Sequence, residues 1–146
     1  MKIIKEPNKL LKQLSEPVTA FDHALRKFIE SMKDTCYKEG GAGLSAVQVG
    51  LTVRVLIYAL DSKLDRFGVM VNPEIKFADY GKQSIIEEGC LSVPNKKIKI
   101  SRPESILVSF KDGRGRTVVK RLGGLRARIV LHEIDHLNGR LITVYE

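Results

Sequence analysis

The spacing of apolar residues predicts a helix early in the chain, over residues 19–39. Apolar side chains recur there every three or four positions, as on one face of an α-helix. Thr19, with Asp22 three residues later, resembles a capping box, and Gly40 with Gly41 provides a stop. The face buried by this helix is expected to consist of Ala24, Leu25, Phe28, Ile29, Met32 and Cys36.

Beyond residue 41 the pattern changes to short strands. Segments rich in β-branched or alternating apolar residues lie at 54–59, 69–71, 84–87, 97–100, 106–110 and 116–121. The last two flank a glycine-rich turn at 111–115, which predicts a hairpin. Asn72 and Pro73 are expected to end the second strand, because proline cannot donate to a sheet ladder.

A second helix is predicted over residues 125–137, ending at Asn138 and Gly139. Its apolar residues lie on nearly every face, so we expect it to be buried almost all round. Two helices with short, mainly antiparallel sheets indicate an α+β fold, with the second helix central. The length of 146 residues, without repeats or a linker, predicts a single domain over 1–146.

Composition places the chain among ordinary globular proteins, with 43% hydrophobic and 29% charged residues. No apolar run is long enough to cross a bilayer, and the N-terminus does not resemble a signal peptide. We therefore expect no membrane contact and a cytoplasmic rather than secreted protein, in a cell, an organelle or an infected host. Cys36 is interpreted as a small buried residue, and His23 as an ordinary surface or half-buried histidine.

The net charge of +8 is concentrated in residues 96–128. Such a basic stretch is consistent with a polyanionic partner such as ribosomal RNA, while a solvated basic surface is the alternative. Only Phe110 interleaves with these charges, which gives base stacking little support.

His132, Glu133 and His136 form the pattern HExxH within the second predicted helix. Residues four apart lie one above the other on a helix, so both imidazoles can bind one ion. Glu133 points to the adjacent flank, where it can contact a metal-bound water without being a ligand. Because buried polar groups need partners, a bound cation suits this apolar helix. The motif alone still leaves a chance match open.

The third ligand must come from upstream of the helix. Ile142 occupies the position where a metzincin has a third histidine, and the only carboxylate after His136 is Glu146. Cys90 is the best candidate, since a thiolate is a strong ligand for iron, zinc or cobalt. Two imidazoles and one thiolate leave a fourth position open, which is typical of a catalytic rather than a structural site.

Three segments together resemble the peptide deformylase family, whose patterns are GxGLAAxQ, EGCLS and HExDH. They are GAGLSAVQ at 41–48, EGCLS at 88–92 and HEIDH at 132–136. The resemblance extends to the leading helix and to residues 92–103, and so spans nearly the whole chain.

The resemblance implies removal of the N-formyl group from N-formylmethionyl nascent peptides, with release of formate. In that reaction a metal-bound water attacks the formyl carbonyl, and Glu133 would act as general acid and base. The side chain of Gln48 and the N–H of Leu91 would stabilise the oxyanion. One divalent ion is implied, Fe(II) in the cell, with zinc, nickel or cobalt as alternatives after purification.

The resemblance also implies where a peptide lies. The first motif and the residues around Gly89 would pair with the peptide backbone, and an apolar pocket would take the methionine side chain. Glu88 and Arg102 resemble an ion pair that steadies the cysteine loop. The expected substrate-binding residues are Ala42, Gly43, Leu44, Ile86, Gly89, Lys97, Leu125, Arg128 and Ile129.

The chain departs from the family pattern at three positions. Ser45 replaces a usual alanine and adds a hydroxyl that needs a partner. Leu131 replaces a common glutamine, and Asn95 a common glycine. The chain also resembles the short C-terminal form of the family, so we expect any transient ribosome contact to involve the basic stretch, and a monomer.

Two other functions are compatible with the metal motif. A broader metallopeptidase would cleave unformylated peptides, but the absence of a downstream ligand weakens this reading. A catalytically inactive peptide-binding relative would be expected to have lost Glu133, Gln48 or Cys90, and all three are present.

Overall fold

The computed structural model describes all 146 residues and has the expected α+β fold. In chain order the elements are η1 (Lys9–Lys12), α1 (His23–Lys38), β1 (Gly43–Ser45), η2 (Ala46–Val49), β2 (Val55–Ala59), β3 (Phe67–Ala78), β4 (Gln83–Cys90), β5 (Val93–Pro103), β6 (Ser105–Lys111), β7 (Thr117–Gly123), α2 (Gly124–Leu137) and η3 (Ile142–Tyr145), where η marks short 3₁₀ helices.

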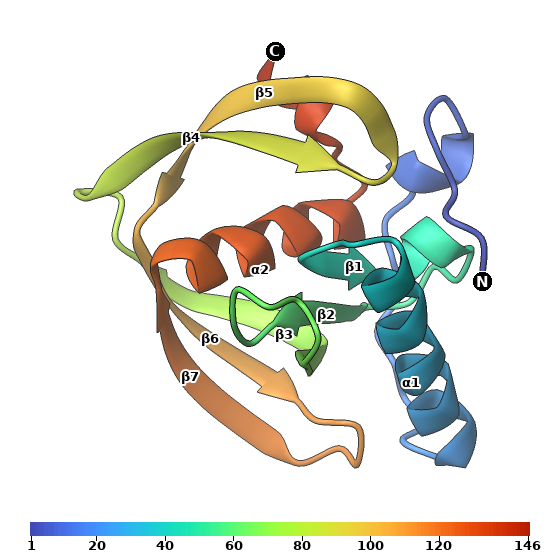
Figure 1. Cartoon of the computed structure of the whole chain (residues 1–146). Helices are drawn as coiled ribbons and strands as arrows, with labels where there is room; N and C mark the ends of the chain where they lie inside the picture. The colour runs from blue at the N-terminus through green and yellow to red at the C-terminus, as the bar shows by residue number, and fades with distance from the viewer.

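Two antiparallel sheets surround helix α2. The larger sheet has five strands in the order β1-β2-β3-β6-β7, and the smaller one is the β4–β5 hairpin. In Figure 1 the hairpin arches over α2 on the side opposite the large sheet. Helix α2 is therefore central, and its side chains reach both sheets.

Strand β2 shows why this sheet is apolar on both faces. Val55, Ile57 and Ala59 pack in the cluster that includes residues of α1, whereas Leu56 and Tyr58 pack in the cluster that includes residues of α2. All five positions are buried. Because side chains alternate along a strand, a fully apolar run is what two covered faces require.

The C-terminal end of α2 is attached to the N-terminal part of the chain. The N–H of Ser15 donates to the carbonyl of Leu137 at 2.9 Å, and the Arg54 guanidinium donates to the same oxygen at 3.0 Å. Gly139 follows the helix with φ +76° and lies very close to the backbone of Lys12. Any Cβ at this position would collide with the carbonyl of Lys12. Only glycine satisfies both the dihedral angle and the close approach.

Several predicted boundaries were wrong: the strands predicted at 84–87 and 97–100 are longer, and two other boundaries differ for local reasons. Helix α1 begins at His23, and its N-cap is Asp22, whose carboxylate accepts from the N–H of Leu25 at 2.9 Å. Strand β3 does not end at Asn72 but continues through Pro73, with a shift of register between Val71 and Glu74. This irregularity accommodates the proline, which lacks the N–H that a regular ladder needs.

Other expectations were confirmed. Cys36 is fully buried, His23 is exposed, and α2 is largely buried after its first turn. None of the helices combines the length and apolar character needed to span a membrane. Strand β1 was not predicted, since three residues are too few to show an alternating pattern.

Candidate metal centre

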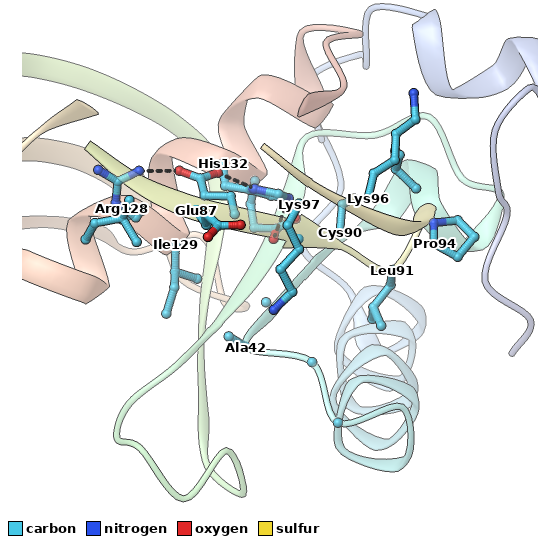
Figure 2. A pocket seen from close by; sticks show the side chains of 18 of the residues that line it. Ala42, Glu87, Cys90, Leu91, Pro94, Lys96, Lys97, Arg128, Ile129 and His132 are labelled. Atoms are coloured by element: carbon cyan, nitrogen blue, oxygen red, sulfur yellow. Dashed lines mark hydrogen bonds and ion pairs between the residues drawn. The ribbon is translucent and has the colours of Figure 1, made fainter. Parts of the chain in front are cut away.

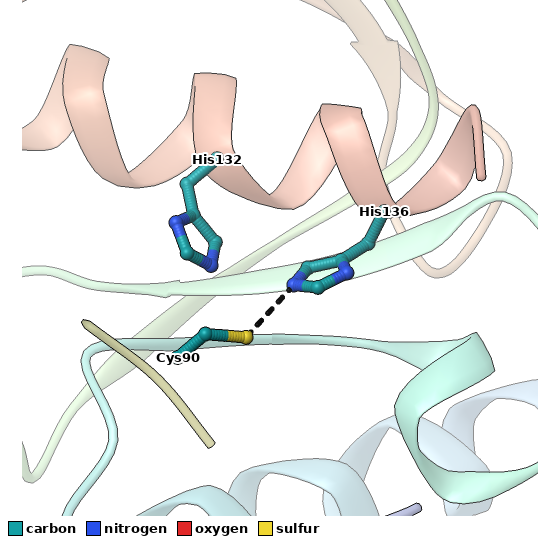
Figure 3. A group of neighbouring side chains, drawn as sticks. All are labelled: Cys90, His132 and His136. Carbon is teal, nitrogen blue, oxygen red and sulfur yellow. Dashed lines mark hydrogen bonds between the residues drawn. The ribbon is translucent and has the colours of Figure 1, made fainter. Parts of the chain in front are cut away.

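Three candidate ligands converge between α2 and the end of β4. His132 and His136 lie one turn apart on α2, and Cys90 is the last residue of β4. Their ligand atoms all lie within 4.8 Å of one another, with Cys90 Sγ 3.3 Å from His136 Nε2. Figure 3 shows the two rings and the sulfur pointing into the same space.

The donor set fits one divalent ion. Donors that share a tetrahedral ion lie about 3.3–3.6 Å apart. The distance from Cys90 Sγ to His136 Nε2 matches this spacing, and no two of the three ligand atoms are more than 4.8 Å apart. Burial lowers the pKa of His136 well below its ordinary value, so its imidazole is neutral. A neutral imidazole is the form that binds metal. The Nδ1 atom of His136 is buried and has no hydrogen-bond partner within the protein, so Nε2 is its only engaged ring nitrogen.

Glu88 is the centre of a buried ionic network behind His132. Its carboxylate accepts from Arg102 at 2.6 and 3.0 Å, from Arg128 at 2.6 Å and from His132 Nδ1 at 2.8 Å. The Glu88–Arg102 pair that the resemblance implied is therefore present. Burial alone would raise the pKa of Glu88, but the bonds from His132 and Arg102 outweigh it and lower the pKa to about 2.

The network continues to the C-terminal 3₁₀ helix. Arg102 Nη1 lies 3.1 Å from Asp135 Oδ2, which also accepts from the Tyr145 hydroxyl at 2.7 Å. The Arg102 guanidinium lies over the Tyr145 ring, 5.2 Å from its centroid. Elements β4, β5, α2 and η3 are thus joined behind one ligand, and the orientation of the His132 ring is fixed by its bond to Glu88.

Glu133 lies on the flank of α2 that faces β1 and is 4% exposed. Its Oε2 atom is 4.0 Å from His132 Nε2, and its Oε1 atom accepts from the Ser45 hydroxyl at 3.0 Å. Burial raises the pKa of Glu133 to about 7, against the opposing effects of His132 and the Ser45 hydroxyl. A carboxylate of this pKa can both accept and return a proton near neutral pH.

Gln48 is held with its amide in one orientation. Its Oε1 atom accepts from the N–H of Ser45 at 2.9 Å, and Nε2 donates to the Ser92 hydroxyl at 3.0 Å and lies 3.9 Å from Cys90 Sγ. The Ser92 hydroxyl donates onward to the carbonyl of Ile4 at 2.7 Å. The NH₂ group of Gln48 therefore faces the cysteine. Leu91, the other expected oxyanion donor, belongs to the two-residue turn between β4 and β5.

A cavity of about 570 Å³ opens beside these groups. Figure 2 shows Lys97 reaching from β5 toward Ala42, while Lys96 points the other way. The side chains of Ile86 and Leu125 at the cavity are 47% and 62% exposed. Among the expected site residues, the lining includes Ala42, Gly43, Gln48, Ile86, Gly89, Cys90, Leu91, Lys97, Leu125, Arg128, Ile129, His132 and Glu133.

Two expected residues do not line the cavity, and a third, Arg128, lines it but is buried. Leu44 is fully buried in the core cluster shared with α1, and His136 lies behind the cavity wall at 1% exposure. Arg128 lines the cavity, but its guanidinium is used by Glu88, the Ile100 carbonyl and Ser84.

Sequence reasoning missed several lining residues, namely Gly40, Glu87, Val93, Pro94, Asn95 and Lys96. It also missed that Arg128 bonds Glu88. The position of Arg128 four residues before His132, on the same helix face, was the available signal for that contact.

Comparisons with known proteins agree with this geometry. The family model described as polypeptide deformylase matches residues 1–145. Curated peptide deformylases from Rickettsia akari and Brucella suis are 38% and 41% identical, over 98% and 92% of this chain and 85% and 78% of theirs. The crystal structure of the Thermotoga maritima peptide deformylase aligns with a TM-score of 0.94 at 38% identity, covering 99% of this chain and 95% of that one. An Acinetobacter baumannii peptide deformylase solved with Met-Ala-Ser bound aligns with a TM-score of 0.93 at 33% identity, covering 100% and 98%.

Proposed function

Because the chain belongs to the polypeptide deformylase family, metal-dependent hydrolases that remove the N-formyl group from nascent peptides, we propose that it does so in the cavity beside Cys90. The observation that carries this assignment is the convergence of three metal donors beside an open cavity that Glu133 and Gln48 line. The whole chain is proposed to act as a single catalytic domain.

Cys90, His132 and His136 would hold the metal. When bound, a divalent ion supplies a water of lowered pKa and polarises the formyl oxygen. We propose Fe(II) as the ion in the cell, with zinc, nickel or cobalt able to replace it, since all four accept two imidazoles and a thiolate. Metal analysis after anaerobic purification tests this, and a preparation containing zinc but no iron would contradict it.

Glu133 moves the proton. Its carboxylate takes a proton from the attacking water and returns it to the amine nitrogen of the leaving peptide, so that formate and a free N-terminus result. Its pKa of about 7 suits both directions of transfer. The formyl oxygen, where negative charge develops, would accept from Gln48 Nε2 and from the N–H of Leu91. The fixed orientation of the Gln48 amide means that this donor needs no reorganisation during the reaction.

The substrate would lie along the edge of the cavity. We propose that residues 42–44 and Gly89 pair with its backbone, with Leu44 contributing through main-chain atoms because its side chain is in the core. Ile86, Leu125 and Ile129 would receive the methionine side chain. The relative solved with Met-Ala-Ser supports a peptide of this kind. Lys97 reaches over the cavity and would contact the peptide beyond its first residue.

We propose that the basic stretch at 96–128 makes a transient contact with the ribosome, where nascent peptides emerge. We further propose that the protein is a cytoplasmic monomer. Sedimentation of the purified chain tests the monomer, and salt-sensitive co-sedimentation with ribosomes tests the contact.

The deciding experiment is a formate-release assay with formyl-Met-Ala-Ser on the iron or nickel protein. We expect formate and free Met-Ala-Ser in equal amounts. Unformylated Met-Ala-Ser is the control, and its cleavage would instead indicate a metallopeptidase. No formate at full metal occupancy would contradict the proposed function and favour an inactive peptide-binding relative.

A further inference from the structure

Strand β1 contacts the proposed acid and base, Glu133, at two of its three residues. Gly43 and Ser45 are separated by one residue, so they point to the same face of the strand, and that face is turned toward α2. Leu44, between them, points to the opposite core. Gly43 and Ser45 contact Glu133 in different ways.

Gly43 leaves room for the carboxylate. A Cβ atom at Gly43 would lie 2.9 Å from Glu133 Oε2 and 3.1 Å from Glu133 Cγ. The same atom would also lie 2.9 Å from Ile129 Cγ2, so a side chain at position 43 would clash with Ile129 as well as with Glu133. The absence of a side chain at Gly43 thus defines the volume in which the carboxylate can lie.

Ser45 bonds the other oxygen of the carboxylate. Its hydroxyl is fully buried and lies 3.0 Å from Glu133 Oε1 and 2.9 Å from the Glu133 carbonyl. A hydrogen bond to an ionised carboxylate is stronger than one to a neutral acceptor. The hydroxyl therefore favours Oε1 when Glu133 is ionised, and Oε2, 4.0 Å from His132 Nε2, is left as the oxygen nearer the metal ligands.

We propose that Ser45 is a positioning residue for the acid and base, and that its hydroxyl restricts the Glu133 carboxylate so that Oε2 carries the transferred proton. The inference rests on the proposed function of Glu133. A carboxylate without such a bond can rotate and spend part of its time with neither oxygen correctly placed.

A second contact distinguishes Ser45 from an ordinary buried serine. Its backbone N–H donates to Gln48 Oε1 at 2.9 Å, and this bond sets the direction of the Gln48 NH₂ group. One residue therefore orients the base through its side chain and the oxyanion donor through its main chain. Replacing Ser45 by alanine removes the side-chain contacts and leaves the main-chain bond to Gln48 Oε1 in place.

The test is steady-state kinetics of Ser45→Ala with formyl-Met-Ala-Ser on the nickel-loaded protein. We expect kcat to fall roughly 3- to 10-fold, a small part of the effect of a general base, with KM and metal content unchanged within twofold. Ser45→Thr keeps the hydroxyl and is expected to recover most of the lost kcat.

Ser15→Ala is the matched control. Ser15 is also buried, at 2% exposure, but its hydroxyl has no hydrogen-bond partner and lies outside the site. Its kcat should equal that of the parent. If Ser15→Ala lowers kcat as much as Ser45→Ala does, the effect is one of general packing and the inference fails.

The outcomes separate the inference from the proposed function. If the parent releases formate and Ser45→Ala has the parent's kcat, the proposed function stands and the inference is overturned. A change in KM alone, or a loss of kcat that follows loss of metal, also overturns it. If the metal-loaded parent releases no formate, the proposed function itself is wrong and the inference falls with it.

Discussion

Two buried glutamates lie on opposite flanks of helix α2, and their pKa values are shifted in opposite directions. Toward the β4–β5 hairpin, Glu88 accepts from two arginines and a histidine, and the pKa of its carboxyl falls to about 2. Toward β1, Glu133 accepts from a single serine side chain, and burial raises its pKa to about 7. Both side chains are almost inaccessible to solvent, but Glu133 lies deeper, and only Glu88 has charged donors that offset the cost of burial.

The difference in pKa suits the two glutamates to different roles: Glu88 to supporting a metal ligand, and Glu133 to transferring a proton. A permanently ionised Glu88 can fix the orientation of His132 but cannot exchange protons near neutral pH. Glu133 can exchange them because only neutral donors are hydrogen-bonded to its carboxylate. Changes on the hairpin flank should therefore affect metal affinity and stability, and changes on the β1 flank should affect turnover.

The largest effect is expected for Glu133→Gln. The amide keeps the shape of the side chain but cannot accept a proton, so kcat should fall by about 10²- to 10⁴-fold. Metal content, measured by elemental analysis, should match that of the parent. Loss of the metal in this variant would show that the β1 flank also holds the ion.

Gln48→Ala should lower kcat by roughly 10²- to 10³-fold, as expected for loss of one oxyanion donor. The measurement is kcat and KM with the formylated tripeptide at full metal occupancy. A rise in KM without a fall in kcat would mean that Gln48 binds the ground state only.

Glu88→Gln tests the other flank. It leaves two buried arginines without their shared anion, and breaking a buried pair of this kind costs about 3–5 kcal/mol of unfolding free energy. Metal affinity, measured by competition with a chelator, should fall roughly 10- to 100-fold. Turnover per bound metal should fall less than in Glu133→Gln or Gln48→Ala. A larger fall in turnover for Glu88→Gln than for these two variants would contradict the separation of roles.

Acid should lower the unfolding free energy of the metal-free protein by protonating Glu88. The pKa of Glu88 is depressed from 4.5 to about 2 on folding, so its stabilisation is fully present above pH 4.5 and lost as the pH falls toward 2. The loss amounts to about 3 kcal/mol. Denaturant unfolding of the metal-free parent and of Glu88→Gln over this range should show a difference that shrinks with acid. A constant difference would mean that Glu88 is not ionised in the folded protein.

The smallest effect is expected for Tyr145→Phe, which removes only the bond to Asp135 at the far end of the network. Unfolding free energy should fall by about 1 kcal/mol, and kcat should stay within twofold of the parent. Tyr80→Phe is the control, because Tyr80 is 71% exposed. Equal stability of the two variants would show that η3 does not support the centre.

Most of the centre could be predicted from the sequence, because its ligands follow either from local spacing or from the exclusion of other residues. The i, i+4 spacing of His132 and His136 needs only a helix, and the apolar residues around them predict one. Cys90 followed from the lack of a suitable ligand after His136. The structure brings these three residues together, as the interpretation required.

What could not be predicted depends on contacts between distant segments. Strand β3 continues past Pro73 through a shift of register, and Asn72 there bonds both main-chain polar groups of Val18, a residue in another part of the chain. Arg128 is drawn into the network only because the hairpin passes over α2 and brings Glu88 to it. The hydroxyl of Ser45 was recognised as needing a partner, but the sequence does not name Glu133.

The attachment of the end of α2 to the segment around Lys12 and Ser15 has a consequence for the order of folding. Gly139 and Leu137 contact residues that are separated from them by almost the entire chain. Contacts of such long range form slowly, because the loop they close is large. We therefore expect the turn that carries His136 to become ordered late, after α1 and the hairpins. A refolding chain will regain most of its secondary structure before it regains tight metal binding.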